Sequence, residues 1–321
     1  MLKLIKGSNK IGKKALTKYL ILSYVIVALT VLCFASRSFD SYLERETMKM
    51  SSTAYEIEAG FTNTLDYTES VLNYINRKIS AADGRKEKVG AILKSFNSSD
   101  SDYNSVRDVL STGMFFWIDS HKMLTMSSEF GFVKMPVDVS GRDYLAQTEK
   151  TPWKIFTGTP ALGAASGQFV IPAGVGVTSD KGVYIGTIAI GFKVYDLVER
   201  FSKLSRRSRT DFAILDGKNK ILMESNEGLF SEDRELLKAL RLAGKDKYDA
   251  IVLDYRIFSP STSYVVMRNF EKYPYQVLVS MQNSAVTSGA ISEIWPHLVE
   301  LLIITIFFGT ILYFIRTVLK K

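Results

Sequence analysis

The chain has 321 residues, enough for one large domain or two small ones, and its formal net charge at pH 7 is +8. The first 18 residues hold six lysines and the last six residues hold three basic side chains, while all 33 acidic side chains lie in between, beside 32 basic ones. The middle of the chain therefore carries a net charge of −1, which excludes a basic nucleic-acid-binding surface there as the source of the positive charge.

Residues 19–36 form an uncharged hydrophobic run (YLILSYVIVALTVLCFAS) between Lys18 and Arg37. A helix needs about 20 mostly apolar residues to cross a bilayer, so this run predicts a transmembrane helix. A cleaved signal peptide is the alternative, because the preceding segment is basic and small residues close the run. The run is longer than the roughly 7–15-residue core of a signal peptide, which favours an uncleaved anchor.

A second hydrophobic run, residues 294–315, predicts a second transmembrane helix. Basic residues lie at the terminal side of each run, in residues 1–18 and 316–321, and such residues favour the cytoplasm. We therefore expect two passes with both termini in the cytoplasm. The only cysteine, Cys33, falls inside the first run, so residues 37–293 contain no disulfide. This favours a bacterial inner membrane, with residues 37–293 in the periplasm, over a secreted-type eukaryotic ectodomain.

An amphipathic helix is predicted directly after the first run. Seven apolar residues and one threonine recur at spacings of three and four: Ala54, Ile57, Phe61, Leu65, Thr68, Leu72, Ile75 and Ile79. Because this spacing is close to a coiled-coil seam, we expect residues 37–90 to form an extended helical stalk and residues 42–80 to form a homodimer contact. The other interpretation is a helix that packs along its own domain, and both can hold, because such a helix can dimerise on one part and pack on another. The small and turn-forming residues 81–84 predict a break in the helix.

Short strands replace the helical pattern from about residue 114. Residues 114–119 and 122–126 flank a Ser-His turn and predict a hairpin, in which Asp119 is expected to be a turn residue. Residues 168–178 and 182–192 predict a second strand pair, and residues 195–204 an amphipathic helix.

The second half of the chain repeats this pattern. Residues 211–216 and 220–224 predict a hairpin like the first one, offset by about 97 residues. A helix at 232–243 and strands at 250–258, 263–270 and 275–281 follow. Antiparallel hairpins with segregated helices indicate an α+β fold with two tandem antiparallel-sheet lobes. We place the lobes at residues 91–204 and 205–290.

Several segments resemble a known family. FFWIDSHKMLTMSS, DVSGRDYL, WKIFTGTPALGAASGQFVIPAGV and GVYIGTIAIGF, after a long helix and an N-terminal anchor, are similar to a double Cache domain. These are PAS-like extracytoplasmic sensor modules of bacterial two-pass receptors such as sensor histidine kinases. The resemblance covers residues 100–200 best and residues 205–285 more loosely. It implies a membrane-distal lobe that binds a small ligand and a membrane-proximal lobe that relays the signal to the second transmembrane helix.

The resemblance also implies a ligand site in the first of these lobes. Arg142 and Tyr144 fall on the segment where the family places ligand contacts, and Trp117 and Trp153 are expected to wall the pocket. A guanidinium binds a carboxylate through two parallel hydrogen bonds, and a tyrosine hydroxyl adds a directed one. The alternatives are a surface salt bridge of Arg142 with Asp143 or Glu149, and tryptophans that belong to the core.

The ligand class follows from a departure from the family. Its amino-acid-binding members hold the ligand's amino group with an acid that follows the arginine motif, but residues 182–192 contain no Asp or Glu and Asp180 falls in the predicted turn. We therefore expect a ligand with an anionic group, such as a carboxylate, and no amino group.

No enzyme, metal site or cofactor is predicted. The chain has two histidines, neither a GxSxG nor a GxxxxGK[ST] motif, and no carboxylate pair marked by its spacing. No output domain follows the second run, so we expect a truncated receptor or a sensory subunit that acts on a separate signalling protein. The alternative function is a structural or interaction module of the bacterial envelope without a small ligand.

Overall fold

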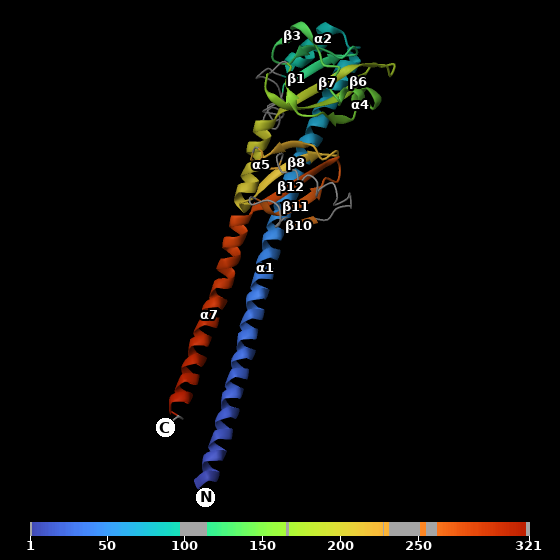
Figure 1. Ribbon diagram of the computed structural model, residues 1–321. Helices are drawn as coiled ribbons and strands as arrows, with labels where there is room; N and C mark the ends of the chain where they lie inside the picture. The colour runs from blue at the N-terminus through green and yellow to red at the C-terminus, as the bar shows by residue number, and fades with distance from the viewer. Residues whose placement is uncertain are drawn as a thin grey trace. The chain divides into compact units, whose positions relative to one another are not determined.

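The computed structural model describes residues 2–96, 114–164, 167–226, 228–230, 251–254 and 262–318 (Figure 1). The chain divides into two compact units, which are described separately. The two-sheet unit comprises Met50–Ser259 and Tyr264–Ser280, and the helical unit comprises Met1–Lys49, Pro260–Ser263 and Met281–Lys321. The predicted helix at 232–243 lies outside the described residues, as does most of the predicted strand at 250–258.

Helix α1 (Leu2–Ala81) supplies the two-sheet unit with its last 32 residues, Met50 to Ala81. The eight residues of the predicted stripe are all fully buried in this unit, which confirms the amphipathic pattern. Beyond Ala81 the chain turns through Asp83 and Gly84, both at positive φ, and the Gly84 N–H donates to the Ile79 carbonyl at 3.2 Å. A left-handed glycine that satisfies a late helical carbonyl is a common helix end.

The buried stripe changes the argument for a homodimer. The coiled-coil-like spacing was the reason to expect a dimer contact at residues 42–80, but between Ala54 and Ile79 the stripe is covered by the chain's own sheets, helices and loops. A surface already buried within one chain is not available to a second copy. A helix that packs along its own domain is the arrangement found in this unit, and a homodimer contact through another part of residues 42–80 stays a prediction.

The first lobe is built on a seven-stranded antiparallel sheet. The strands run in the order β3 (Gly131–Asp138), β2 (Met123–Ser127), β1 (Phe115–Asp119), β7 (Tyr184–Lys193), β6 (Phe169–Thr178) and β4 (Ile155–Thr157), and β5 (Ala161–Leu162) also pairs with β6. Helices α2 (Lys86–Ser95) and α4 (Leu145–Lys150) belong to the same lobe. The two long central strands β6 and β7 are mostly buried and supply the framework for the site described below.

The second lobe is built on a five-stranded sheet. Its order is β10 (Ile251–Asp254), β11 (Thr262–Asn269), β12 (Tyr275–Gln282), β8 (Asp211–Asp216) and β9 (Ile221–Glu224). Helix α5 (Val194–Ser208) connects the lobes, beginning directly after β7. Helices and antiparallel sheets are thus segregated, and the predicted α+β class with two tandem sheets is confirmed.

Asparagine side chains tie α1 to the backbone of the first lobe. The Asn73 amide donates to the Trp153 carbonyl and the Asn76 amide to the Gly176 carbonyl, both at 2.9 Å. One turn further on, the Ser80 hydroxyl donates to the Thr178 carbonyl at 2.6 Å. Since residues three and four apart share a helix face, Asn76 and Ser80 together hold α1 along β6, while Asn73 holds it to the segment before β4.

An aromatic cluster and a partly buried ion pair hold α1 against the second lobe. The ring of Phe61 contacts those of Phe201, Phe270 and Tyr275 edge-on, at centroid distances of 5.5–6.2 Å. Beside it, the Glu58 carboxylate accepts a hydrogen bond from the Arg268 guanidinium and another from the Glu271 N–H at 3.1 Å.

The helical unit consists of the N-terminal part of α1 and helix α7 (Asn283–Val318). Both helices are long and apolar enough to cross a membrane, and they include the predicted spans 19–36 and 294–315. Polar contacts join the two helices at several levels. The Tyr24 hydroxyl lies 3.0 Å from the Thr305 hydroxyl, and the Ser38 hydroxyl lies 3.0 Å from Nε2 of His297.

Candidate ligand cavity in the first lobe

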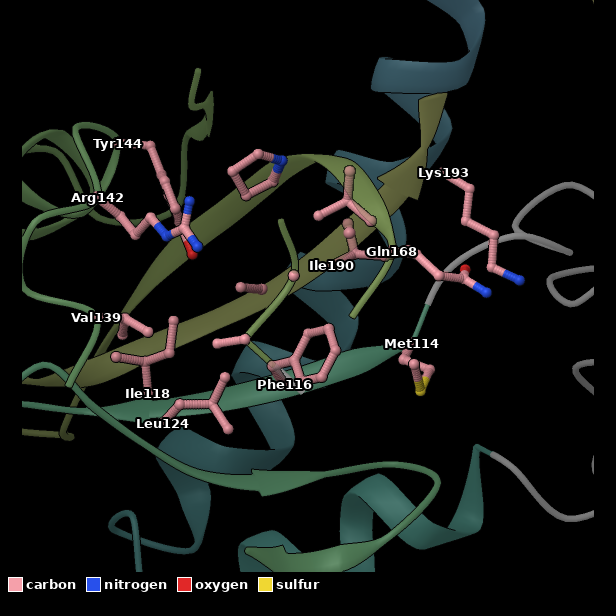
Figure 2. A pocket seen from close by; sticks show the side chains of 16 residues that line it. Met114, Phe116, Ile118, Leu124, Val139, Arg142, Tyr144, Gln168, Ile190 and Lys193 are labelled. Carbon is pink, nitrogen blue, oxygen red and sulfur yellow. The ribbon is translucent and has the colours of Figure 1, made fainter. Parts of the chain in front are cut away.

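A small cavity of about 60 Å³ lies on one face of the seven-stranded sheet (Figure 2). Alternate residues of β1 face it, together with residues of β2, β6 and β7 and of the segments after β3 and β5. Its apolar walls include Phe116, Ile118, Leu124, Val139, Val170, Pro172 and Ile190. Ligand sites are commonly apolar in this way, with a few polar groups that fix orientation.

Arg142 supplies a cationic group to the wall. It lies in a turn after β3, where the Asp138 carboxylate accepts the Ser140 N–H at 2.8 Å and the Arg142 N–H donates to the Val139 carbonyl at 3.0 Å. One terminal guanidinium nitrogen, Nη2, donates to the Leu162 carbonyl at 2.9 Å, which fixes the side chain beside the cavity. A guanidinium has five N–H donors, so this bond leaves most of them for a ligand.

Tyr144 supplies a hydroxyl to the same wall and is 4% exposed. Burial raises the pKa of its hydroxyl, despite the opposing effect of Arg142, so the group stays protonated and can donate a hydrogen bond. Its ring lies against two glycines. A Cβ on Gly158 would lie 2.8 Å from the ring, and one on Gly174 would lie 2.9 Å from it. Figure 2 shows the polar ends of Arg142 and Tyr144 directed toward one another.

The two predicted tryptophans do not line the cavity. Trp117 is buried, but it lies between Phe116 and Ile118 on β1 and faces the opposite side of the sheet, because successive side chains of a strand alternate. Trp153 is 38% exposed and has a φ of 70°, and its backbone pairs with Gly176 and Asn73 instead. The structure thus brings Arg142 and Tyr144 together and leaves both tryptophans elsewhere. That Arg142 and Tyr144 bind a ligand stays a prediction.

Two further polar residues, which the sequence patterns did not single out, line the cavity. Gln168 precedes β6, and Lys193 ends β7. In the view of Figure 2 they lie on the far side of the cavity from Arg142. The register of β6 against β7, which places Lys193 opposite Val170, could have identified Lys193, but only after that pairing was known. Among the described lining residues there is no Asp or Glu.

The segment that carries Arg142 and Tyr144 is linked to the second lobe through the loop that holds Thr157 and Thr159. Between Arg142 and Tyr144, the Asp143 carboxylate accepts the Thr159 hydroxyl at 2.8 Å and the Thr159 N–H at 3.2 Å. Two residues before Thr159, the Thr157 hydroxyl is hydrogen-bonded to the Tyr275 hydroxyl. Tyr275 is the first residue of β12 and belongs to the aromatic cluster around Phe61.

Asp119 is a turn residue, as predicted. Its carboxylate accepts the backbone N–H groups of His121 and Met123, both at 3.0 Å. Within the described ranges, no group of three or more His, Cys, Asp and Glu side chains could hold a metal ion.

Comparison with solved structures identifies proteins of the same fold. The extracellular domain of rpHK1S-Z16, a protein classed as a histidine kinase, matches at a TM-score of 0.58 and 18% identity, over 77% of this chain and 98% of that one. The ligand-binding domain of the Campylobacter jejuni chemoreceptor Tlp3, in complex with 4-methylisoleucine, matches at a TM-score of 0.54 and 18% identity, over 78% of this chain and 94% of that one. The ligand-binding domain of Mlp24 with asparagine matches at a TM-score of 0.52 and 9% identity, over 78% of this chain and 99% of that one.

These likenesses show the fold. The chain has the fold of the PAS-like sensor domains of histidine kinases and chemoreceptors, which confirms the resemblance stated from the sequence. No protein-family model matches the sequence. A search of curated proteins also finds no match.

Proposed function

We propose that the protein is a membrane-bound sensor that detects a small anionic molecule outside the cytoplasm. The observation that carries this proposal is the apolar cavity with Arg142 and Tyr144 on its wall. The guanidinium would bind the anionic group and the protonated tyrosine would orient it, while the apolar walls would cover the rest of the ligand.

The charge of the cavity supports a carboxylate without an amino group. Tlp3 is described with isoleucine and Mlp24 with asparagine, and both ligands carry an ammonium group beside the carboxylate. In this chain the described lining residues include Arg142 and Lys193 but no acid. A buried ammonium without a partner is costly, so a carboxylate of the same carbon skeleton that lacks the amino group should bind better.

A chain of contacts supports a route for the signal. A ligand held by Arg142 and Tyr144 would move Asp143, which is hydrogen-bonded to Thr159. The same loop would then act on Tyr275 through Thr157, and β12 continues directly into α7. Ångström-scale helix shifts are a usual form of such switches.

We also propose the arrangement in the membrane. Residues 19–36 and 294–315 would cross it, both termini would be cytoplasmic, and the lobes at 91–204 and 205–290 would be periplasmic. The basic residues at the two ends support this orientation. Reporter fusions after Leu20, Ser98 and Lys321 should report inside, outside and inside. An N-terminus cleaved near residue 36, found by mass spectrometry, would contradict the two-pass arrangement.

The ligand hypothesis is tested with the full chain in detergent. Pairs of acids that share a carbon skeleton and differ only in an amino group are screened by thermal unfolding, because a ligand at 100 times its Kd stabilises by about 2.7 kcal/mol. We expect the acid without the amino group to raise Tm more than its amino-acid partner. Arg142→Ala should abolish the shift, whereas Arg77→Ala, which removes an exposed arginine of α1 that does not line the cavity, should preserve it.

Two results would contradict the proposal. The first is no stabilisation by any acid of a broad panel, which would favour an interaction module without a small ligand. The second is an equal shift in the wild type and in the Arg142→Ala variant. The signal route is tested by hydrogen exchange of β12, which should change on ligand binding in the wild type. In the Tyr275→Phe variant the ligand should still bind, but the exchange of β12 should not change.

A further inference from the structure

A second, wider cleft lies between the two lobes of the two-sheet unit, with a volume of about 440 Å³. The first lobe lines it with Lys154 and the loop that holds Thr157 and Thr159, and the second lobe with Lys218, Lys272 and Tyr275. Unlike the cavity of the first lobe, it has three lysines and no arginine among its described lining residues.

The acids of this cleft already have hydrogen-bond donors. Asp143 accepts the hydroxyl and the N–H of Thr159, and Asp216 accepts the N–H groups of Lys218 and Lys220 at 2.8 and 2.9 Å. Each carboxylate is therefore held within its own lobe by a turn or loop.

The lysines differ in their partners. Lys272 donates to Asp66 at 2.7 Å and is neutralised by it. The Lys154 ammonium lies 5.9 Å from the centre of the Phe156 ring, and neither Lys154 nor Lys218 forms an ion pair with a described carboxylate. Each lobe thus contributes to the cleft one ammonium without an ion pair to a described carboxylate, beside the Asp143 and Asp216 carboxylates, whose partners are uncharged.

We propose that this cleft is a binding site for a phosphate group, either free or on a small molecule, held between Lys154 and Lys218. A lysine ammonium is a compact charge with three rotatable donors and is a usual phosphate ligand, whereas planar carboxylates favour arginine. Lys154 and Lys218 would each supply one ammonium group to the phosphate. Thr157 and Tyr275, whose hydroxyls are hydrogen-bonded to each other, line the same cleft.

The cleft and the cavity of the first lobe share a wall. Tyr144 lines both of them. Of the two residues before it, Arg142 lines the cavity and Asp143 lines the cleft. Occupation of the cleft would hold the two lobes at one separation and would fix the loop next to Tyr144. Because coupling between two sites is reciprocal, the phosphate would modulate the affinity of the cavity as well.

The test is titration calorimetry of the full chain in detergent at constant ionic strength, with inorganic phosphate and, separately, glycerol 3-phosphate. We expect saturable binding of one phosphate group per chain. Lys154→Gln combined with Lys218→Gln should weaken it at least tenfold. Lys181→Gln removes an exposed lysine outside the cleft and should leave the affinity unchanged. Arg142→Ala should also leave it unchanged, which separates this site from the proposed carboxylate site.

The outcomes decide the proposal. Binding of inorganic phosphate alone would assign a free-anion site, and tighter binding of glycerol 3-phosphate would assign a phosphorylated small molecule. No saturable heat with either probe would overturn the proposal. Equal affinity of the double lysine variant and the wild type would also overturn it, as would loss of binding in Arg142→Ala with binding retained in the double variant.

Discussion

Asp119 and Asp216 lie 97 residues apart and form the same turn in the two lobes. Asp119 accepts the N–H groups of His121 and Met123, and Asp216 accepts those of Lys218 and Lys220. The match extends to Lys122 and Asn219, which both have positive φ values, 62° and 61°.

The same offset relates the hydrogen bonds at the other end of each hairpin. The Ser128 hydroxyl accepts the Phe115 N–H at 3.2 Å, and the Ser225 hydroxyl accepts the Phe212 N–H at 2.9 Å. The two hairpins also have a register irregularity at matching positions, after Trp117 and after Ile214. The weak sequence repeat predicted at this offset therefore corresponds to the same hairpin built twice.

The first prediction concerns these turns. Asp119→Ala removes the acceptor of two backbone N–H groups and should destabilise the protein by about 1–2 kcal/mol. Asp119→Asn retains an acceptor oxygen and should cost less. The urea midpoint of unfolding of the full chain measures the stability of both variants. Equal stability of the alanine variant and the wild type would show that solvent replaces the carboxylate in the turn.

The second prediction concerns Gly174. A Cβ there would lie 2.8 Å from a methyl group of Thr187 and 2.9 Å from the Tyr144 ring, so Gly174→Ala should cost about 1–3 kcal/mol and displace the tyrosine. The affinity for the ligand should also fall, because Tyr144 lines the cavity. Gly141→Ala is the matched control, since no atom lies within 4 Å of the added carbon. Thermal unfolding with and without ligand compares the two variants.

The third prediction concerns the pair of Glu58 and Arg268. The Glu58 side chain is 8% exposed and that of Arg268 is 24% exposed. Glu58→Gln leaves the guanidinium partly buried without its counter-charge and should destabilise by about 2–4 kcal/mol. Glu46→Gln alters a more exposed ion pair with Lys49 and should cost less than about 1 kcal/mol. A Glu58→Gln variant as stable as Glu46→Gln would contradict the assigned role of the pair.

The fourth prediction concerns the pH dependence of stability. Burial works to raise the pKa of Asp66, but hydrogen bonds from Lys272 and Tyr273 outweigh it and hold this pKa below the ordinary 3.8. A carboxylate with a lowered pKa stabilises the fold above its ordinary value, and this contribution is lost as the pH falls through the folded-state value.

Asp66→Asn should therefore be less stable than the wild type at pH 7, by less than about 1 kcal/mol because the side chain is 39% exposed. The difference should shrink as the pH falls below about 3.8. Urea midpoints between pH 2.5 and 7 measure it. A difference that stays constant over this range would mean that the Asp66 charge does not contribute.

The helical and strand patterns of the sequence predicted the framework because burial enforces them. The stripe from Ala54 to Ile79 and the hairpin beside Asp119 follow periods that the chain must keep to cover its apolar side chains. The same stripe did not indicate what covers it, since a coiled-coil partner and the chain's own sheets demand similar spacing.

The candidate site was only partly predictable. Arg142 and Tyr144 belong to one short segment that the family resemblance marked, and the structure places both on the cavity. Trp117 was expected there because aromatic side chains commonly wall small-ligand sites, but the alternation of β1 directs it to the other face of the sheet. Lys193 lies on the cavity because β7 pairs with β6, a contact between segments that local patterns do not specify.

The bonds from α1 to Gly176 and Thr178 end on main-chain carbonyls. Every residue type has a carbonyl, so these attachments do not depend on which side chains β6 carries. Substitutions that reshape the cavity from β6 can therefore accumulate while the helix keeps its register. Homologues with different ligands are expected to retain polar donors at positions 73, 76 and 80 even where the cavity residues have diverged.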